Sequence, residues 1–121
     1  MSILSTILTT FVALEFFYIM YLETFATSSP TTSRVFNMTK DELQRPSVTV
    51  LFKNQGIYNG LIGVGLLYGI FFATASLEVS RLLLVYIILV ALYGSFTSNK
   101  KIILTQGGLA ILAFLSTFLN I

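Results

Sequence analysis

Four long apolar stretches dominate this chain and constrain its fold more than any other feature. They lie near residues 3–23, 50–73, 81–97 and 101–121. A helix needs about 20 predominantly apolar residues to cross a bilayer. Inside lipid, a helix satisfies its own backbone hydrogen bonds, as a membrane segment must. The sequence therefore predicts an all-α, polytopic membrane protein, with a single domain over residues 1–121 folded as a four-transmembrane-helix bundle.

The composition agrees with a membrane location and excludes several kinds of site. The chain is 55% hydrophobic and 10% charged, whereas ordinary soluble domains are about 25% charged. It has no Cys and no His, which excludes disulfides, thiol catalysis and the usual zinc sites. We therefore expect no cofactor and no metal. The net charge of +2 is interpreted as loop charge, and no nucleic-acid partner is expected.

The basic residues fall mostly on one side of the predicted bundle. Six of the seven are in or beside the first connection, near residues 26–49, or in the third. Because successive helices alternate in direction, these two connections lie on the same side, which the positive-inside rule places in the cytoplasm. Both termini are then extracytoplasmic. The six residues are Arg34, Lys40, Arg45, Lys53, Lys100 and Lys101.

The first connection is the only extended polar segment. Residues 28–33 (SSPTTS) are typical of a turn or loop. Thr39 and Glu42 have the spacing of a capping box, which predicts a short helix over residues 40–45, ended by Pro46. The simpler interpretation is a solvated connector. The alternative is a lid or a docking element over the cytoplasmic face.

Glu15 lies in the middle of the first apolar stretch and is the best pointer to function. An ionisable side chain costs a few kcal/mol or more at that depth. It is tolerated only if it faces the protein interior, finds partners or stays protonated. Glu23, near the end of the same stretch, is interpreted as an ordinary helix-end charge.

Polar side chains of the four predicted helices fall at similar depths in the cytoplasmic half, since a helix rises about 1.5 Å per residue. The outer half is nearly all aliphatic and aromatic. This pattern predicts a cavity that opens to the cytoplasm, with amides and tyrosines around a carboxylate. Taken singly, such amides also serve as packing contacts. The candidate ligand-binding or proton-linked residues are Glu15, Tyr18, Gln55, Asn59, Tyr93 and Gln106.

The second apolar stretch carries two pairs of glycines spaced four residues apart. Gly56 and Gly60 form one pair, and Gly65 and Gly69 form the other. This spacing predicts close helix packing, either within the bundle or between subunits. No nucleophile elbow, phosphate loop or dinucleotide fingerprint accompanies it, so no catalytic residue is named.

Residues 14–25 (LEFFYIMYLETF), 54–60 (NQGIYNG), 93–94 (YG) and 106–107 (QG) carry a family resemblance. With these motifs the chain resembles the small four-helix bacterial integral membrane proteins catalogued as domain of unknown function thirteen-oh-four. The resemblance covers nearly the whole chain, and the NQGIYNG run is its most specific part. It implies the fold, the membrane location and a bacterial source, but no activity.

The size of the chain and its mid-helix glutamate are also similar to those of the small multidrug-resistance exporters. In those four-helix proteins a first-helix glutamate binds cations and protons alternately, and only Glu15 corresponds to it here. The absence of Trp, the long charged first connection and the one-sided basic residues argue against membership.

Three functions remain open from the sequence. The first is binding or proton-linked transport of a small lipophilic or cationic molecule in a cytoplasm-facing intramembrane cavity. The second is a membrane enzyme with isomerase-like acid–base chemistry on a lipophilic substrate, with Tyr18 or Tyr93 as proton donor. The third is a structural or assembly protein. The expected partners are the lipid bilayer, a small lipophilic ligand and further copies of the chain.

Overall fold

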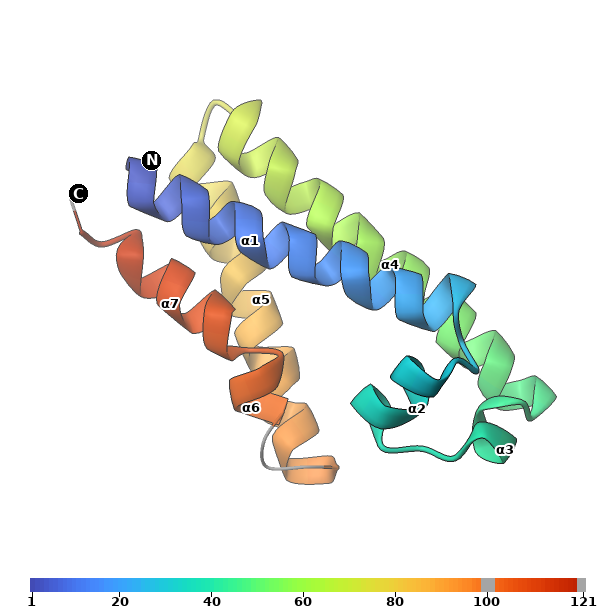
Figure 1. Cartoon of the computed structure of the whole chain (residues 1–121). Coiled ribbons are helices and arrows are strands. Elements are labelled where there is room, and N and C mark those ends of the chain that lie inside the picture. The colour runs from blue at the N-terminus through green and yellow to red at the C-terminus, as the bar shows by residue number, and fades with distance from the viewer. Residues whose placement is uncertain (99–101, 120–121) are drawn as a thin grey trace. The chain divides into compact units, whose positions relative to one another are not determined.

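The structure is a computed structural model that describes residues 1–98 and 102–119 (Figure 1). Within these residues the secondary structure is helical and no strand is present, so the all-α prediction is confirmed. The chain divides into two compact units. Unit 1 comprises Met1–Ala13 and Val64–Ile121, and unit 2 comprises Leu14–Gly63.

The first helix, α1, and the longest helix, α4, are each divided between the two units. The boundary falls between residues 13 and 14 in α1 and between residues 63 and 64 in α4. A π-helix, η1, continues α1 without a break. The elements are α1 (Ile3–Met20), η1 (Tyr21–Phe25), α2 (Pro30–Phe36), α3 (Lys40–Leu43), α4 (Pro46–Phe71), α5 (Ser76–Thr97), α6 (Ile102–Thr105) and α7 (Gly108–Ser116).

Unit 2 contains a helix that the sequence did not predict. Residues 28–33 were expected to form a turn, but α2 begins at Pro30. The Ser29 side chain accepts a hydrogen bond from the Thr32 amide, and proline at the first helical position has a backbone angle suited to a helix. The helix ends at Asn37, whose φ of 54° is left-handed. Together, cap and proline turn a serine- and threonine-rich run into a helix.

The predicted capping box is present at the start of α3. The Glu42 amide donates to Thr39 Oγ1, and the Thr39 amide donates to the Glu42 carboxylate. The α3 helix ends at Leu43, which is fully buried. Pro46 does not end a helix directly; instead it opens α4, four residues before the expected position. Proline fits this first position because it has no backbone N–H to leave unpaired.

Unit 1 is built around the packing of α5 against α6 and α7, which lie side by side in Figure 1. Its core holds Leu66 of α4, Leu84 and Ile87 of α5, and two alanines of α7. The single helix expected over residues 101–121 is instead two, α6 and α7. The interruption falls at Gln106 and the glycine pair 107–108, and glycine is among the weakest helix formers. Lys101 and the last two residues lie outside the described residues.

Among the described residues, two helices are long and apolar enough to cross a membrane. They are Ile3–Phe25, which joins α1 and η1, and Ser76–Thr97, which is α5. The α4 helix has 26 residues but includes Lys53, Asn54, Gln55 and Asn59, which lower its hydropathy. The two apolar helices suggest membrane association.

Candidate functional site

A buried carboxylate–amide pair links η1 to α4 inside unit 2. Only 4% of the Glu23 surface is exposed. Asn59 Nδ2 donates a hydrogen bond to Glu23 Oε1 over 2.5 Å. A buried carboxyl group is costly unless it is hydrogen-bonded, so this bond offsets the cost of burying Glu23. We call these two residues the Glu23–Asn59 pair.

Glu23 reaches its buried position in a π-helical turn. The Ala26 amide donates to the Tyr21 carbonyl five residues earlier, over 3.0 Å. Wider turns of this kind are rare and are frequent at functional sites. Two buried threonines accompany it: Thr27 Oγ1 donates to the Glu23 carbonyl over 2.7 Å, and Thr32 Oγ1 to the Ala26 carbonyl over 2.6 Å. These side-chain bonds occupy backbone oxygens at the end of the turn.

Gly56 allows α4 to pass close to η1. A Cβ atom at Gly56 would overlap Thr24 Oγ1 and lie 3.1 Å from both Glu23 Cβ and the Met20 carbonyl oxygen. Thr24 Oγ1 also donates to the Lys53 carbonyl of α4 over 3.0 Å. Because position 56 has no side chain, α4 and η1 lie close enough for Asn59 to donate its hydrogen bond to Glu23.

Gly60 lies one turn further along α4 and is also buried. A Cβ atom there would overlap the sulfur of Met20. That sulfur is the end of a flexible side chain, which adapts more easily than the groups around Gly56. Gly56 and Gly60, four residues apart, therefore both lie against the continuous helix formed by α1 and η1.

Glu15 has a different environment from Glu23. The residue is partly exposed, but its Oε1 atom is buried and has no hydrogen-bond partner among the described residues. A buried polar atom without a partner calls for an explanation, such as a bound water, ion or proton. Glu15 therefore has one carboxylate oxygen whose hydrogen-bonding capacity is unused among the described residues.

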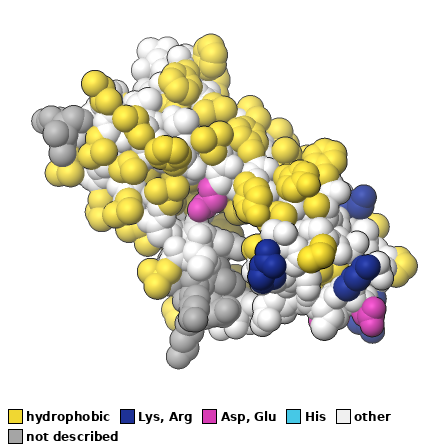
Figure 2. All heavy atoms as spheres, in the orientation of Figure 1, with side chains coloured by type: hydrophobic (Ala, Val, Ile, Leu, Met, Phe, Trp, Pro, Cys, Tyr) yellow, Lys and Arg dark blue, Asp and Glu magenta, His cyan; other side chains and the backbone are white. Residues whose placement is uncertain are grey.

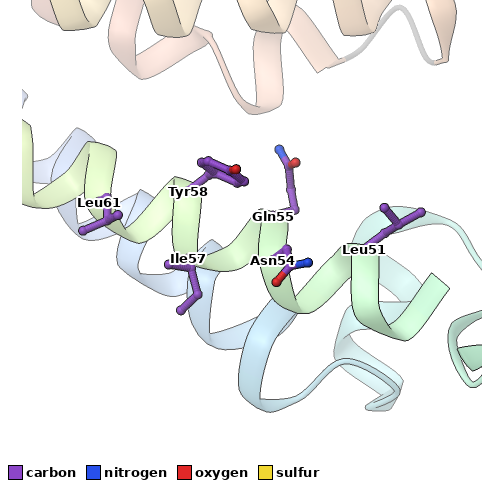
Figure 3. Close-up of a pocket in the computed structure, with 6 residues that line it drawn as sticks. All are labelled: Leu51, Asn54, Gln55, Ile57, Tyr58 and Leu61. Carbon is purple, nitrogen blue, oxygen red and sulfur yellow. The ribbon is translucent and has the colours of Figure 1, made fainter. Parts of the chain in front are cut away.

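Tyr18 and Gln55, two other expected site residues of unit 2, are exposed. Gln55 belongs to a hollow of about 600 Å³ whose lining residues all come from α4. Figure 3 shows Gln55 and Tyr58 pointing to the same side of that helix. Asn59 instead bonds to Glu23. Gln55 is therefore not part of the site around Glu23.

Tyr93 and Gln106 belong to unit 1. The Tyr93 side chain is 70% exposed, and Gln106 follows α6 and is partly exposed. The other four expected site residues belong to unit 2. The convergence of all six on one cavity stays a prediction.

The second glycine pair lies in unit 1 and also meets a neighbouring helix. A Cβ atom at Gly69 would lie 3.0 Å from Ser80 Oγ and 3.1 Å from Val79 Cγ1 of α5. At Gly65 it would lie 3.2 Å from Leu83 Cδ1. All three distances are shorter than ordinary van der Waals contacts, so α4 and α5 approach closely along this part of unit 1.

The buried position of Glu23 was not predicted from the sequence. Its place near the end of an apolar stretch predicted an ordinary helix-end charge, whereas the structure buries it against Asn59. Two sequence signals could have identified it. Glu23 is a second carboxylate, eight residues after Glu15 in the same apolar stretch, and its partner Asn59 belongs to the NQGIYNG run. Among the described residues, no group of three His, Cys, Asp or Glu side chains is placed to hold a metal ion.

Comparisons with known proteins show the family of the chain. The model of the family described as "Protein of unknown function (DUF1304)" matches residues 10–118. The chain is 78% identical over 118 residues to "Uncharacterized protein YpaA" of Lactococcus lactis subsp. lactis (strain IL1403), covering 98% of this chain and 99% of that protein. No solved structure matches it. The chain therefore belongs to the family of proteins of unknown function DUF1304.

Proposed function

We propose that this chain is a multi-pass protein of the bacterial cytoplasmic membrane with both termini outside the cytoplasm. The two apolar helices carry the argument, because only 28% and 22% of their apolar windows are buried. The core helix of a soluble protein would be mostly buried. Figure 2 shows apolar side chains over much of one face, and exposed apolar surface on this scale is typical of lipid contact. The α4 helix and the α6–α7 region would supply the remaining passes.

Within that membrane protein, the function that we propose is binding or proton-linked transport of a small lipophilic cation. The observation that carries it is a buried carboxylate, Glu23, and a partly exposed one with a buried oxygen, Glu15, in one candidate span. Glu23 has a single side-chain donor, Asn59, and Glu15 Oε1 has none among the described residues. A carboxyl group in a dry environment is stable when it holds a proton or faces a cation. Proton and cation would therefore compete for the same oxygens.

The neighbouring side chains favour an organic cation over a metal ion. Tyr18 and Tyr21 are both exposed near the two carboxylates in sequence, and aromatic faces attract cations. Asn59 contributes an amide, which fixes the Glu23 carboxylate without supplying a titrating proton. The expected proton donors of the isomerase-like alternative, Tyr18 and Tyr93, are both exposed, so neither is enclosed with a buried carboxylate, and this arrangement favours binding.

The test uses purified full-length protein in detergent, with tetraphenylphosphonium as the probe. We expect cation binding to release protons into a weakly buffered solution, and both signals to weaken at low pH. Glu15→Gln and Glu23→Gln should each reduce the affinity at least about tenfold, or about 1.4 kcal/mol. Glu78→Gln is the matched control, because Glu78 is an exposed carboxylate in unit 1.

Two outcomes would contradict the proposal. Unchanged binding in both glutamate variants would remove the carboxylates from the site. If tetraphenylphosphonium does not bind, and both variants change only the stability of the protein, the Glu23–Asn59 pair is a packing contact. Topology is tested separately by reporter fusions at residue 121, and activity of a cytoplasm-only reporter would overturn the proposed orientation.

A further inference from the structure

The part of unit 2 between the apolar helices is folded and carries much of the charge of the chain. We call residues 26–53 the basic segment. Leu43 is fully buried within it, and Thr49 Oγ1 donates to the Leu43 carbonyl over 2.7 Å. Phe36 and Phe52 meet edge to face with ring centroids 5.2 Å apart. These contacts hold its surface residues in a fixed arrangement rather than in a loose loop.

The basic segment has four exposed basic side chains and two exposed acidic ones, Asp41 and Glu42. Its net charge of +2 equals that of the whole chain. Glu42 is engaged with Thr39 and lies close enough to Arg45 to interact electrostatically with it. In Figure 2 the Lys and Arg side chains visible on that face gather where Figure 1 places α2, α3 and the start of α4. The basic residues are Arg34, Lys40, Arg45 and Lys53.

Large apolar side chains are exposed among these charges. Val35, beside Arg34 in α2, is 52% exposed, and Leu51, two residues before Lys53 in α4, is 66% exposed. Phe25, at the end of the apolar helix that enters the segment, is 71% exposed. Exposed apolar groups interspersed with basic residues are typical of surfaces that rest on a bilayer, with the apolar groups at the acyl boundary and the cations at the phosphates.

We propose that the basic segment docks onto the anionic headgroups of the membrane leaflet next to it. The inference rests on the membrane location proposed above. A lipid surface is favoured over an acidic protein because the segment directly follows the apolar helix Ile3–Phe25 and leads into α4. The segment is therefore attached to the bilayer on one side by a helix of spanning length.

The test compares full-length protein in nanodiscs of phosphatidylcholine with nanodiscs that also contain phosphatidylglycerol. Spin-labelled versions of each lipid report which one the protein retains, and hydrogen exchange reports protection of residues 26–53. We expect preferential retention of phosphatidylglycerol and greater protection in its presence. High salt should abolish both, because headgroup attraction is screened within about a Debye length.

Charge variants identify the residues responsible. Arg34→Gln, Lys40→Gln, Arg45→Gln and Lys53→Gln should each reduce the preference, and their combination should abolish it. Asp41→Asn should increase the preference. Glu78→Gln is the control, since it changes a charge in unit 1 and should leave the preference unchanged. The single variants keep the test decisive if the combined variant does not fold.

The possible outcomes separate this inference from the proposed function. Equal retention of both lipids by protein that is inserted in nanodiscs would overturn the docking inference alone. Release of the protein from native membranes by alkaline carbonate would overturn the membrane location and the docking with it. Equal protection by inorganic phosphate would assign the segment to free phosphate and contradict headgroup docking.

Discussion

Units 1 and 2 both bury polar side chains between helices, but they use different chemistry. In unit 1 the Ser5 and Ser116 hydroxyls lie 3.0 Å apart and join α1 to α7. In unit 2 an amide donates to the Glu23 carboxylate. Hydroxyls do not titrate in the physiological range, whereas a carboxyl group gains or loses a proton. The proton-linked chemistry that we propose therefore involves unit 2, whereas the Ser5–Ser116 contact of unit 1 holds helices together.

In unit 1 the charged side chain of Arg81 contributes to helix packing. Arg81 of α5 donates through Nε to Thr117 Oγ1 over 3.0 Å and through Nη2 to the Thr117 carbonyl over 2.8 Å. Its guanidinium also lies 4.1 Å from the centre of the Phe118 ring. These contacts tie the start of α5 to the end of α7. A charged side chain held by several contacts is thus structural here, in contrast to Glu15 with its unpartnered oxygen.

The largest expected effect comes from filling the close approach in unit 2. Gly56→Leu would overlap Thr24 Oγ1 and crowd the Met20 carbonyl, and we expect a loss of about 3 kcal/mol of unfolding free energy. Unfolding in detergent measures it. Gly108→Ala is the control, because a Cβ atom there meets nothing within 4 Å. Equal stability of the two variants would show that the approach of α4 to η1 is absent.

Removal of the amide partner should cost somewhat less. Asn59→Leu leaves the buried Glu23 carboxyl group without its side-chain donor, and we expect a loss of about 2 kcal/mol. Glu23→Gln should lose less, because an amide at position 23 still accepts a hydrogen bond from Asn59. If Asn59→Leu proves as stable as the wild type, the Glu23–Asn59 pair does not hold the helices in unit 2.

The corresponding bond in unit 1 should contribute less again. A double-mutant cycle of Ser5→Ala and Ser116→Ala isolates the hydroxyl contact, and we expect a coupling of about 0.6 kcal/mol. The coupling should not depend on pH, because neither group titrates. A coupling above that of the Glu23–Asn59 pair would reverse the comparison between the units.

The smallest effect concerns the capping box of α3. The Thr39 amide, and then its hydroxyl, donate to the Glu42 carboxylate and hold its pKa below the ordinary value of 4.5. A carboxyl group with a lowered folded-state pKa stabilises the fold above its unfolded pKa, and this contribution is lost as pH falls through the folded value. The protection factors of the α3 amides, which correct for the intrinsic exchange rate, should fall below pH 4.5 in the wild type but not in Glu42→Gln. Identical pH dependence would exclude the capping contribution.

Several local features were predictable because they depend on neighbouring residues. The Thr39–Glu42 capping box requires only its own spacing. The long apolar runs predicted helices at α1, α4 and α5, with boundaries shifted by several residues. The turn expected at residues 28–33 was wrong because Ser29 and Pro30 begin a helix. The last expected helix was divided because residues 107–108 are both glycine.

By itself, the sequence determined the helical class, the apolar surface and the family, because periodicity, hydropathy and motifs are properties of the chain alone. The environments of Glu15 and Glu23 were decided only by the tertiary structure. Both are glutamates in one apolar helix, yet Glu23 bonds to Asn59 from 36 residues away and Glu15 Oε1 has no partner among the described residues. That difference depends on the wider π-helical turn and on the space left by Gly56, which set the distance between two helices. No local pattern specifies that distance, because it arises only when the helices pack.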